Sequence, residues 1–345
     1  MKQALITGGS GFFGGILERR LLSEGWNCVN IDLIPDTDKF LNLESIQCDI
    51  RSMNALKDVF SARRFDVVFH IAAMLAHENI SKGSLWGSNV DGTRNIAEMA
   101  VKHGVRSMVF TSSNCLWGNG LGRPILEDDP PHPVEIYGKS KLEGERILQK
   151  YTGKLNCVTI RCPTIIDEGR LGLLSILFEF IDEGRKVWVI DGGKNIYQWI
   201  YAPDLADACI RAAHLERSTV FNIGSDNVKS LRDVYSYVID KAGTGARLVS
   251  IPRIPTIPLM KLAYWLKLSP LGPYQYRMIA EDFIFNTSRI KKELGWQPTV
   301  TNEEMLYRSF VYFHQNRKVL EARQNVSAHS KPADMGIIRF LKWLS

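Results

Sequence analysis

The 345-residue sequence lacks the features that mark several classes of protein. It contains no run of 18 apolar residues, which a bilayer-spanning helix needs, and it leads directly into an apolar strand-like run, so we expect no secretory signal. The net charge of +6 is accompanied by no Lys/Arg block, zinc-finger spacing or aromatic RNA-binding motif. We therefore expect no nucleic-acid partner, although a charge of this size suits an anionic ligand or a membrane surface.

The six cysteines form no CxxC pair, and most of them lie in apolar runs. This distribution favours reduced core thiols in a cytoplasmic protein over disulfides, and it predicts no metal site. Aliphatic and aromatic residues make up 45% of the chain and charged residues 23%, as in ordinary globular proteins. The length suffices for one large α/β domain or for a domain with an added lobe.

A glycine-rich segment near the N-terminus is the clearest motif. The apolar run 4–7 leads into Gly8, Gly11 and Gly14, and helical apolar spacing follows Gly14. This order suits a dinucleotide-binding unit, in which a pyrophosphate binds the N–H groups of a helix N-terminus and requires close backbone approach. A structural glycine turn in another α/β protein is the alternative. A second apolar run, 28–31, ends in Asp32, which we expect to bind the adenosine ribose.

Strand-like and helical patterns alternate beyond Asp32. We expect strands at 45–47, 67–71, 107–110 and 157–161, and helices at 53–60, 89–103 and 137–151. The alternation predicts an α/β fold with a doubly wound parallel (Rossmann) sheet, whose ligands bind at the carboxyl ends of the strands. Five candidate residues fall at such ends: Gly8, Asp32, Asp49, Ala72 and Ser113.

Near residue 165 the pattern changes to shorter elements with many prolines, which predicts a smaller, discontinuous C-terminal substrate lobe. We divide the chain into a cofactor-binding domain at 1–165 with a return at about 196–220, a substrate lobe over most of 166–316, and a linker with an amphipathic tail at 317–345.

A series of short motifs runs through the chain in a characteristic order and spacing. These are TGGSGFFG at 7–14, Asp32, CDI at 48–50, HIAA at 70–73, NVDGT at 89–93, TSS at 111–113, YGKSK at 137–141, RCPT at 161–164 and ELGWQP at 293–298. Taken together, they resemble the extended short-chain dehydrogenase/reductase family of the NAD-dependent epimerase/dehydratase type, over roughly residues 1–316. The resemblance implies that Tyr137 exchanges a proton with a substrate hydroxyl while NAD takes or gives a hydride. Lys141, four residues along the same helical face, would favour the phenolate, and Ser113 would hydrogen-bond the substrate oxygen.

The resemblance also implies a set of cofactor contacts. These are Gly8, Gly11, Phe12, Phe13, Gly14, Asp32, Asp49, Ile50, Ala72, Ala73, Tyr137, Lys141 and Pro163. Asp32 would repel a 2′-phosphate, and the two residues after it, Leu33 and Ile34, supply no arginine to bind one. We therefore predict NAD rather than NADP as the cofactor.

The substrate is less well defined. Many family members act on nucleotide-sugars, and we expect substrate contacts from Ser113, Thr164, Arg170, Tyr197 and Arg277. The chain departs from the usual pattern at 195–199 and 274–277, where arginines normally complete a diphosphate site. We predict an epimerase that forms a 4-keto intermediate on a nucleotide-linked or lipid-diphosphate-linked sugar, as in polysaccharide biosynthesis. The alternatives are a 3β-hydroxysteroid-type NAD-dependent dehydrogenase and a non-catalytic NAD-binding regulator.

Two apolar segments with basic residues remain open to interpretation, IPTIPLMKLAYWLKL at 254–268 and MGIIRFLKWL at 335–344. They suit either a membrane interface, with peripheral contact through the C-terminal tail, or core packing and a docked tail. A cytoplasmic protein is expected, with membrane association and a homodimer as open alternatives.

Overall fold

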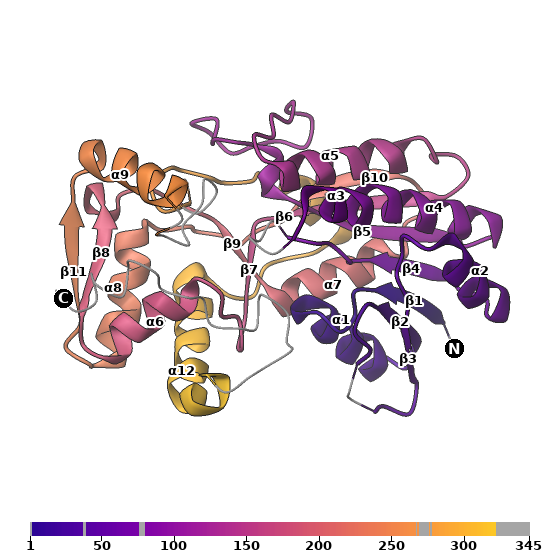
Figure 1. Ribbon diagram of the computed structural model, residues 1–345, viewed down its shortest axis with the longest axis horizontal. Coiled ribbons are helices and arrows are strands. Elements are labelled where there is room, and N and C mark those ends of the chain that lie inside the picture. Colours follow the sequence, from indigo (N-terminus) through magenta and orange to yellow (C-terminus); the bar gives the residue numbers. More distant parts are fainter. Residues whose placement is uncertain are drawn as a thin grey trace.

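The computed structural model describes residues 2–36, 39–75, 80–266, 268, 276 and 278–321. Figure 1 shows a large sheet with flanking helices beside a smaller lobe. The large sheet contains β1 (Gln3–Thr7), β2 (Asn27–Asp32), β3 (Leu43–Gln47), β4 (Val67–His70), β5 (Ser107–Ser113), β6 (Asn156–Cys162) and β10 (Thr219–Asn222). Its helices are α1 (Phe12–Ser23), α2 (Met53–Ala62), α3 (Lys82–Trp86), the π-helix η1 (Gly87–Gly92), α4 (Thr93–Lys102), α5 (Ile136–Gln149), α7 (Ala202–Ala212) and α11 (Ser288–Leu294).

The seven strands of this sheet are all parallel, in the order β10-β6-β5-β4-β1-β2-β3. The predicted doubly wound parallel sheet is therefore confirmed. The chain runs outward from β1 to β3 and then crosses to β4 on the other side of β1. The order thus reverses between β1 and β4, which is where ligands bind in such sheets.

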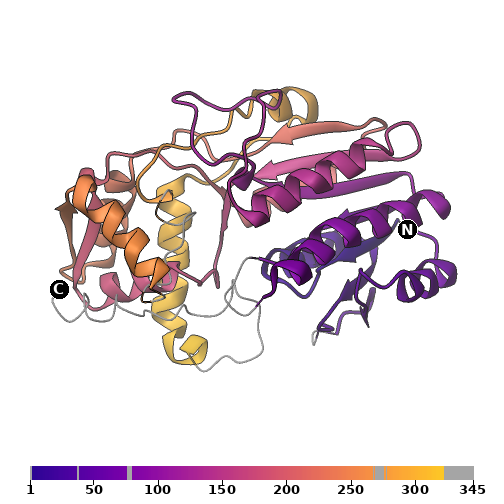
Figure 2. The same cartoon turned by 45° about the horizontal axis from the view of Figure 1, so that its top comes forward.

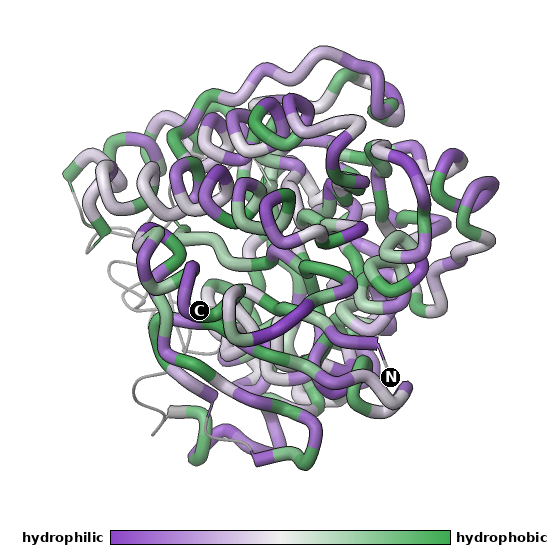
Figure 3. Tube along the Cα trace, turned by 90° about the vertical axis from the view of Figure 1, so that its right-hand side faces the viewer, coloured by the Kyte–Doolittle hydropathy of each residue, from purple (hydrophilic) through white to green (hydrophobic). Residues whose placement is uncertain are grey.

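Both faces of the sheet are covered by helices, which explains its continuous apolar strands. Along β1, Ala4 and Ile6 pack in one core cluster with α1 and α7, whereas Leu5 packs in the other with α2 and α4. Figure 2 shows the layer with α4 and α5 in front of the sheet. Along the outer helices, hydrophilic and hydrophobic positions alternate, as the colours of Figure 3 show, so each helix turns one face inward.

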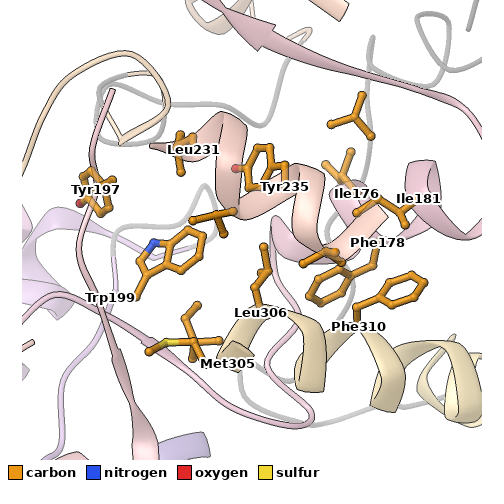
Figure 4. Close-up of a cluster of buried hydrophobic side chains, with 14 of the residues drawn as sticks. Ile176, Phe178, Ile181, Tyr197, Trp199, Leu231, Tyr235, Met305, Leu306 and Phe310 are labelled. Carbon is orange, nitrogen blue, oxygen red and sulfur yellow. The ribbon is translucent and has the colours of Figure 1, made fainter. Parts of the chain in front are cut away.

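The smaller lobe has its own core. It contains β7 (Thr164–Ile166), β8 (Lys186–Ile190), β9 (Trp199–Tyr201), β11 (Arg247–Ile251), α6 (Leu174–Asp182), α8 (Leu231–Ala242), α9 (Arg253–Trp265) and α12 (Asn302–Glu321). Figure 4 shows side chains from α6, α8, β9 and α12 meeting in this core, including Phe178, Tyr235, Trp199 and Leu306. β7 pairs with β9 and β8 pairs with β11, each in a two-stranded parallel sheet.

Some boundaries differ from those that the sequence predicts. α1 begins at Phe12, not after Gly14, because glycine at positions 11 and 14 does not prevent a helical turn. The helix expected at 89–103 continues from α3 through the π-helix η1. The proposed return to the large domain includes α7 and β10, and buried Trp296 also joins that core by donating to the Asp204 carbonyl oxygen (2.9 Å). The division near residue 165 stays a prediction.

The amphipathic tail predicted at 335–344 lies outside the described residues. Within the described part of the chain, no helix is both long enough and apolar enough to span a bilayer.

Candidate active site

The glycine turn after β1 is packed against neighbouring backbone too closely for a side chain. Gly8 has a positive φ of 80°, and a Cβ there would lie 2.7 Å from the Ala72 Cα. A Cβ on Gly14 would lie 2.2 Å from the Gly8 carbonyl oxygen. Gly11 precedes α1, and no side chain of the described residues caps that helix. Its first N–H groups are therefore available to an anion, so the turn fits the pyrophosphate of NAD.

Asp32, predicted to bind the ribose, lies beside this turn at the end of β2. Burial raises the pKa of its carboxyl, while backbone hydrogen bonds from Ile34, Leu33 and Ser10 act in the opposite direction. Asn30, which sequence reasoning did not identify, accepts the Gly9 N–H at 2.9 Å and donates to the Ser10 hydroxyl at 2.9 Å. It therefore holds the glycine turn against β2. In the sequence, Asn30 is marked only by being an amide within an apolar run, and the structure shows that it is buried.

Two of the predicted cofactor contacts, Asp49 and Ile50, lie after β3, where we expect the adenine. The Asp49 carboxylate accepts two hydrogen bonds from the Arg51 side chain, at 2.6 and 2.9 Å, and these hydrogen bonds lower the pKa of Asp49. Ile50 is buried against η1, where a Cβ on Gly92 would lie 2.6 Å from the Ile50 Cδ1. Arg51 would compete with an adenine amino group for the Asp49 carboxylate. The adenine contacts stay predictions.

A directed chain of hydrogen bonds positions the segment after β4. The Ala72 N–H donates to the Thr7 hydroxyl (3.2 Å), which lies 2.7 Å from Nδ1 of fully buried His70. The other ring nitrogen, Nε2, lies 2.8 Å from the Thr93 hydroxyl, which itself donates to the Asn89 carbonyl oxygen (2.7 Å). Thr93 must therefore accept from His70 Nε2–H, which leaves Nδ1 to accept from Thr7. The chain requires a neutral imidazole, in keeping with burial that lowers the pKa of His70 to about 3.

Asn89 ties the same segment to α5. Its buried amide accepts the Met74 N–H at 2.7 Å, and its Nδ2 donates to the Met74 carbonyl oxygen and to the Ser140 hydroxyl, each at 3.0 Å. These hydrogen bonds hold the segment that carries two predicted cofactor contacts. Of these, Ala72 is half-buried and Ala73 is exposed. Asn89 is thus a positioning residue whose role the NVDGT motif alone did not reveal.

The predicted catalytic residues come together where β5 ends and α5 begins. Ser113 is the last residue of β5, and its hydroxyl accepts the Cys115 N–H at 3.1 Å. A Cβ on Gly138 would lie 2.1 Å from the Cys115 carbonyl oxygen, so the first turn of α5 packs directly on the turn after Ser113. Tyr137 is half-buried in that first turn, and Lys141 follows one turn later on the same side of the helix.

Lys141 is almost fully buried, with a relative exposure of 2%. Its ammonium group lies 4.1 Å from the centre of the Phe110 ring. Burial lowers the pKa of Lys141 from 10.5 to about 8, with smaller opposing effects from Cys162 and Glu145. The side chain therefore carries its charge at neutral pH in a nearly dry environment, where a cation acts strongly on a neighbouring phenol.

A pocket that opens to solvent is lined by Asn114 and Cys115, which follow Ser113, and by Glu135, two residues before Tyr137. Its walls come from the segment after β5, from the residues just before α5, and from residues between 278 and 283. Tyr197 also lines it, and its hydroxyl accepts a hydrogen bond from Asn114 Nδ2 at 2.6 Å. Its contact with a substrate stays a prediction. Asn114 is a second polar group that sequence reasoning missed.

The other predicted contacts are distributed around this pocket and the glycine turn. Pro163 is buried directly after β6, and the Thr164 hydroxyl lies 3.7 Å from the Met278 sulfur at the pocket. Arg170, predicted to bind substrate, stacks over the Phe12 ring at 5.7 Å, which puts its guanidinium beside the glycine turn. Phe13, the neighbour of Phe12, is buried in the core. Arg277 lies outside the described residues.

Comparisons with known proteins agree with this geometry. The model of the NAD dependent epimerase/dehydratase family matches residues 4–224, from β1 to just beyond β10. An uncharacterised protein of Sinorhizobium fredii, y4nG, is 35% identical over 99% of this chain and 86% of its own length. UDP-glucose 4-epimerase of Mycolicibacterium smegmatis is 26% identical over 90% of this chain and 98% of its own.

Among solved structures, UDP-glucose 4-epimerase of Thermotoga maritima with UDP-glucose superposes with a TM-score of 0.75. It is 22% identical, and the match covers 92% of this chain and all of that one, so it shows the shared fold. The family match confirms both the resemblance drawn from the motifs and the expected cofactor. The chain belongs to the NAD dependent epimerase/dehydratase family and is an NAD-dependent enzyme of the short-chain dehydrogenase/reductase type.

Proposed function

We propose that this enzyme is a 4-epimerase that acts on a sugar carried by a nucleotide or lipid diphosphate. Its family and relatives support sugar epimerase or dehydratase chemistry. The observation that carries the proposal is the close packing of the Ser113 turn on the start of α5, beside a pocket with polar groups from Asn114 and Tyr197. That arrangement suits a substrate hydroxyl at the strand end and a hydroxyl-rich ring in the pocket.

Tyr137 acts as the acid and base in this proposal. A free tyrosine has a pKa near 10, too high for an efficient base at neutral pH. The buried charge of Lys141 favours the phenolate, because an opposite charge in a dry environment stabilises the ionised form. Ser113 holds the same substrate oxygen by a hydrogen bond, which keeps it within reach of the Tyr137 hydroxyl.

The residues that would hold NAD are the glycine turn, Asp32 and the segment around Ala72. Bound NAD supplies a reversible hydride acceptor at the substrate carbon. Loss of the hydroxyl proton and the carbon-bound hydride gives a 4-keto sugar, and its reduction on the opposite face gives the 4-epimer. The overall reaction then consumes no NAD.

The test is turnover with a panel of UDP-, GDP- and dTDP-sugars and lipid-diphosphate-linked sugars. We expect one of them to be inverted at C4, as measured by NMR, with no accumulation of NADH. Stoichiometric NADH formation with a 3β-hydroxysteroid would replace the proposal with the dehydrogenase alternative, and NAD binding without turnover of any panel member would contradict it.

A catalytic variant sharpens this test. Tyr137→Phe keeps the ring and removes the ionisable oxygen, so we expect turnover to fall about 10²- to 10⁴-fold with NAD binding retained. Tyr151→Phe, just beyond the C-terminal end of α5, is the matched control and should retain activity. Activity of Tyr137→Phe within threefold of wild type would remove Tyr137 from the mechanism.

A further inference from the structure

Helix α9 turns its apolar side chains outward. None of its residues is buried, although ten of the thirteen are apolar. Ile254 is 87% exposed and Trp265 is 77% exposed, and Leu259, Leu262 and Leu266 are each about half exposed or more. Their spacing places them on one side of the helix, while the half-buried Thr256, Ile257, Met260 and Ala263 lie on the other. The outward side is therefore a continuous apolar stripe.

The stripe lies at the outer edge of the smaller lobe, at the end of the molecule away from the large sheet (Figure 1). Isolated exposed apolar side chains are ordinary, but a contiguous stripe on one helix marks a contact surface. The thirteen residues of α9 are too few to cross a bilayer, which takes about 20.

The charged residues within the segment that carries the stripe are all basic. Residues 252–268 contain Arg253, Lys261 and Lys267 and no acidic residue. Lys261 is exposed one turn before Trp265, so a cation lies at the border of the apolar surface. An apolar stripe with a Trp near its end and a lysine at its border is the pattern of a helix that lies in a membrane interface.

We propose that α9 docks the protein on an anionic membrane surface, with the stripe from Ile254 to Leu266 in the headgroup region. The side chains of the stripe enter the boundary of the acyl chains, and Lys261 faces the lipid phosphates. This proposal does not depend on which substrate the enzyme uses.

A second copy of this chain fits the stripe less well. A two-fold dimer would pack the stripes of the two copies against each other and bring their Lys261 side chains close together. With no acidic residue in the segment to compensate, like charges would meet in a desolvated contact. Anionic lipid supplies the missing negative charge.

The experiment is sedimentation of the full chain with vesicles of phosphatidylcholine alone and of phosphatidylcholine mixed with phosphatidylglycerol. Trp265→Glu and Leu262→Glu each place a negative charge in the stripe at an exposed position, so the fold has little packing to lose. Leu41→Glu is the matched control, because Leu41 is fully exposed on the large domain. Circular dichroism and NAD binding verify that each variant is folded.

We expect the wild type and Leu41→Glu to partition onto the mixed vesicles, more weakly at high salt. The two α9 variants should lose about tenfold or more of that partitioning, since each replaces an apolar side chain that would enter the membrane with one that anionic lipid repels. Undiminished binding of both α9 variants, or no binding of the wild type to either vesicle, would overturn the proposal. A wild-type dimer in light scattering that Trp265→Glu converts to a monomer would overturn it too, in favour of a second copy.

Discussion

Lys141 gives a prediction in which stability and catalysis oppose each other. Its ammonium group is buried with a relative exposure of 2%, and its pKa falls from 10.5 to about 8 because burial disfavours the charge. We expect Lys141→Met to unfold less readily than wild type at pH 7 while losing turnover. Methionine keeps the length and apolar stem of lysine and removes the charge, so the packing around Phe110 changes little.

The size of the effect follows from proton linkage. A shift from 10.5 to about 8 corresponds to about 3 kcal/mol of native-state cost at pH 7. The methionine variant has no charge to bury, so it should be more stable than wild type by up to about 3 kcal/mol at pH 7. Because the folded pKa is the lower one, the unfolded chain binds more protons between pH 8 and 10.5. Wild-type stability therefore rises through this window, and the gain of the variant shrinks by about 2 kcal/mol between pH 7 and about pH 9.5.

Urea unfolding at these two pH values measures the effect. Lys139→Met is the matched control, since Lys139 is exposed two residues earlier on α5, and its stability should follow that of wild type at both pH values. A methionine variant that is no more stable than wild type at pH 7, or whose advantage does not change with pH, would refute the reasoning. Retained turnover would refute the role given to the Lys141 charge.

Three further predictions concern the cofactor site and the catalytic turn. Asp32→Ala should weaken NAD binding and reduce discrimination against NADP, because the ribose acceptor and the repulsive carboxylate both disappear. Calorimetry with both cofactors tests this, and a wild-type preference for NADP would contradict it. Glu18→Gln should stabilise the protein by about 2 kcal/mol at pH 7, because burial raises the pKa of Glu18 from 4.5 to about 8 and wild-type stability falls as the pH rises through that window. Unfolding measured at pH 5 and pH 7 should show that the stability advantage of the variant grows with pH. Gly138→Ala should reduce turnover about 10²-fold, because its Cβ would push α5 away from the Cys115 carbonyl by about 1 Å. The control Gly83→Ala, where the atom nearest to the new Cβ is 3.9 Å away, should retain activity, and equal activity of the two variants would count against this reasoning.

The sequence predicted the parts of the site that local patterns encode. The apolar run before Gly8 and the alternation of strands and helices indicate which residues fall at strand ends, and the structure places Asp32 and Ser113 there. Neither Asn30 nor His70 was identified, because their roles arise from partners 21 and 63 residues away in the chain. Likewise, the position of Arg170 over Phe12 depends on how the smaller lobe packs against the large domain, which periodicity does not encode.

The exposure of the apolar side chains of α9 is likewise not predictable from the sequence. The apolar spacing within 254–268 predicts a helical face but does not say whether other elements cover it. Only the packing of the lobe shows that Ile254 and Trp265 point outward.

The position of α9 also bears on the choice between the two sugar carriers. Arg253, its first residue, donates to the Ala280 carbonyl oxygen at 2.8 Å and lies 3.5 Å from the Glu281 carboxylate. Glu281 lines the same pocket as Asn114 and Glu135, so α9 begins at the rim of that pocket. If α9 lies on a membrane, the rim of the pocket lies close to the lipid headgroups, where the sugar of a lipid diphosphate is located. A nucleotide-linked sugar diffuses in water and gains nothing from this placement, so the geometry of α9 favours the lipid carrier.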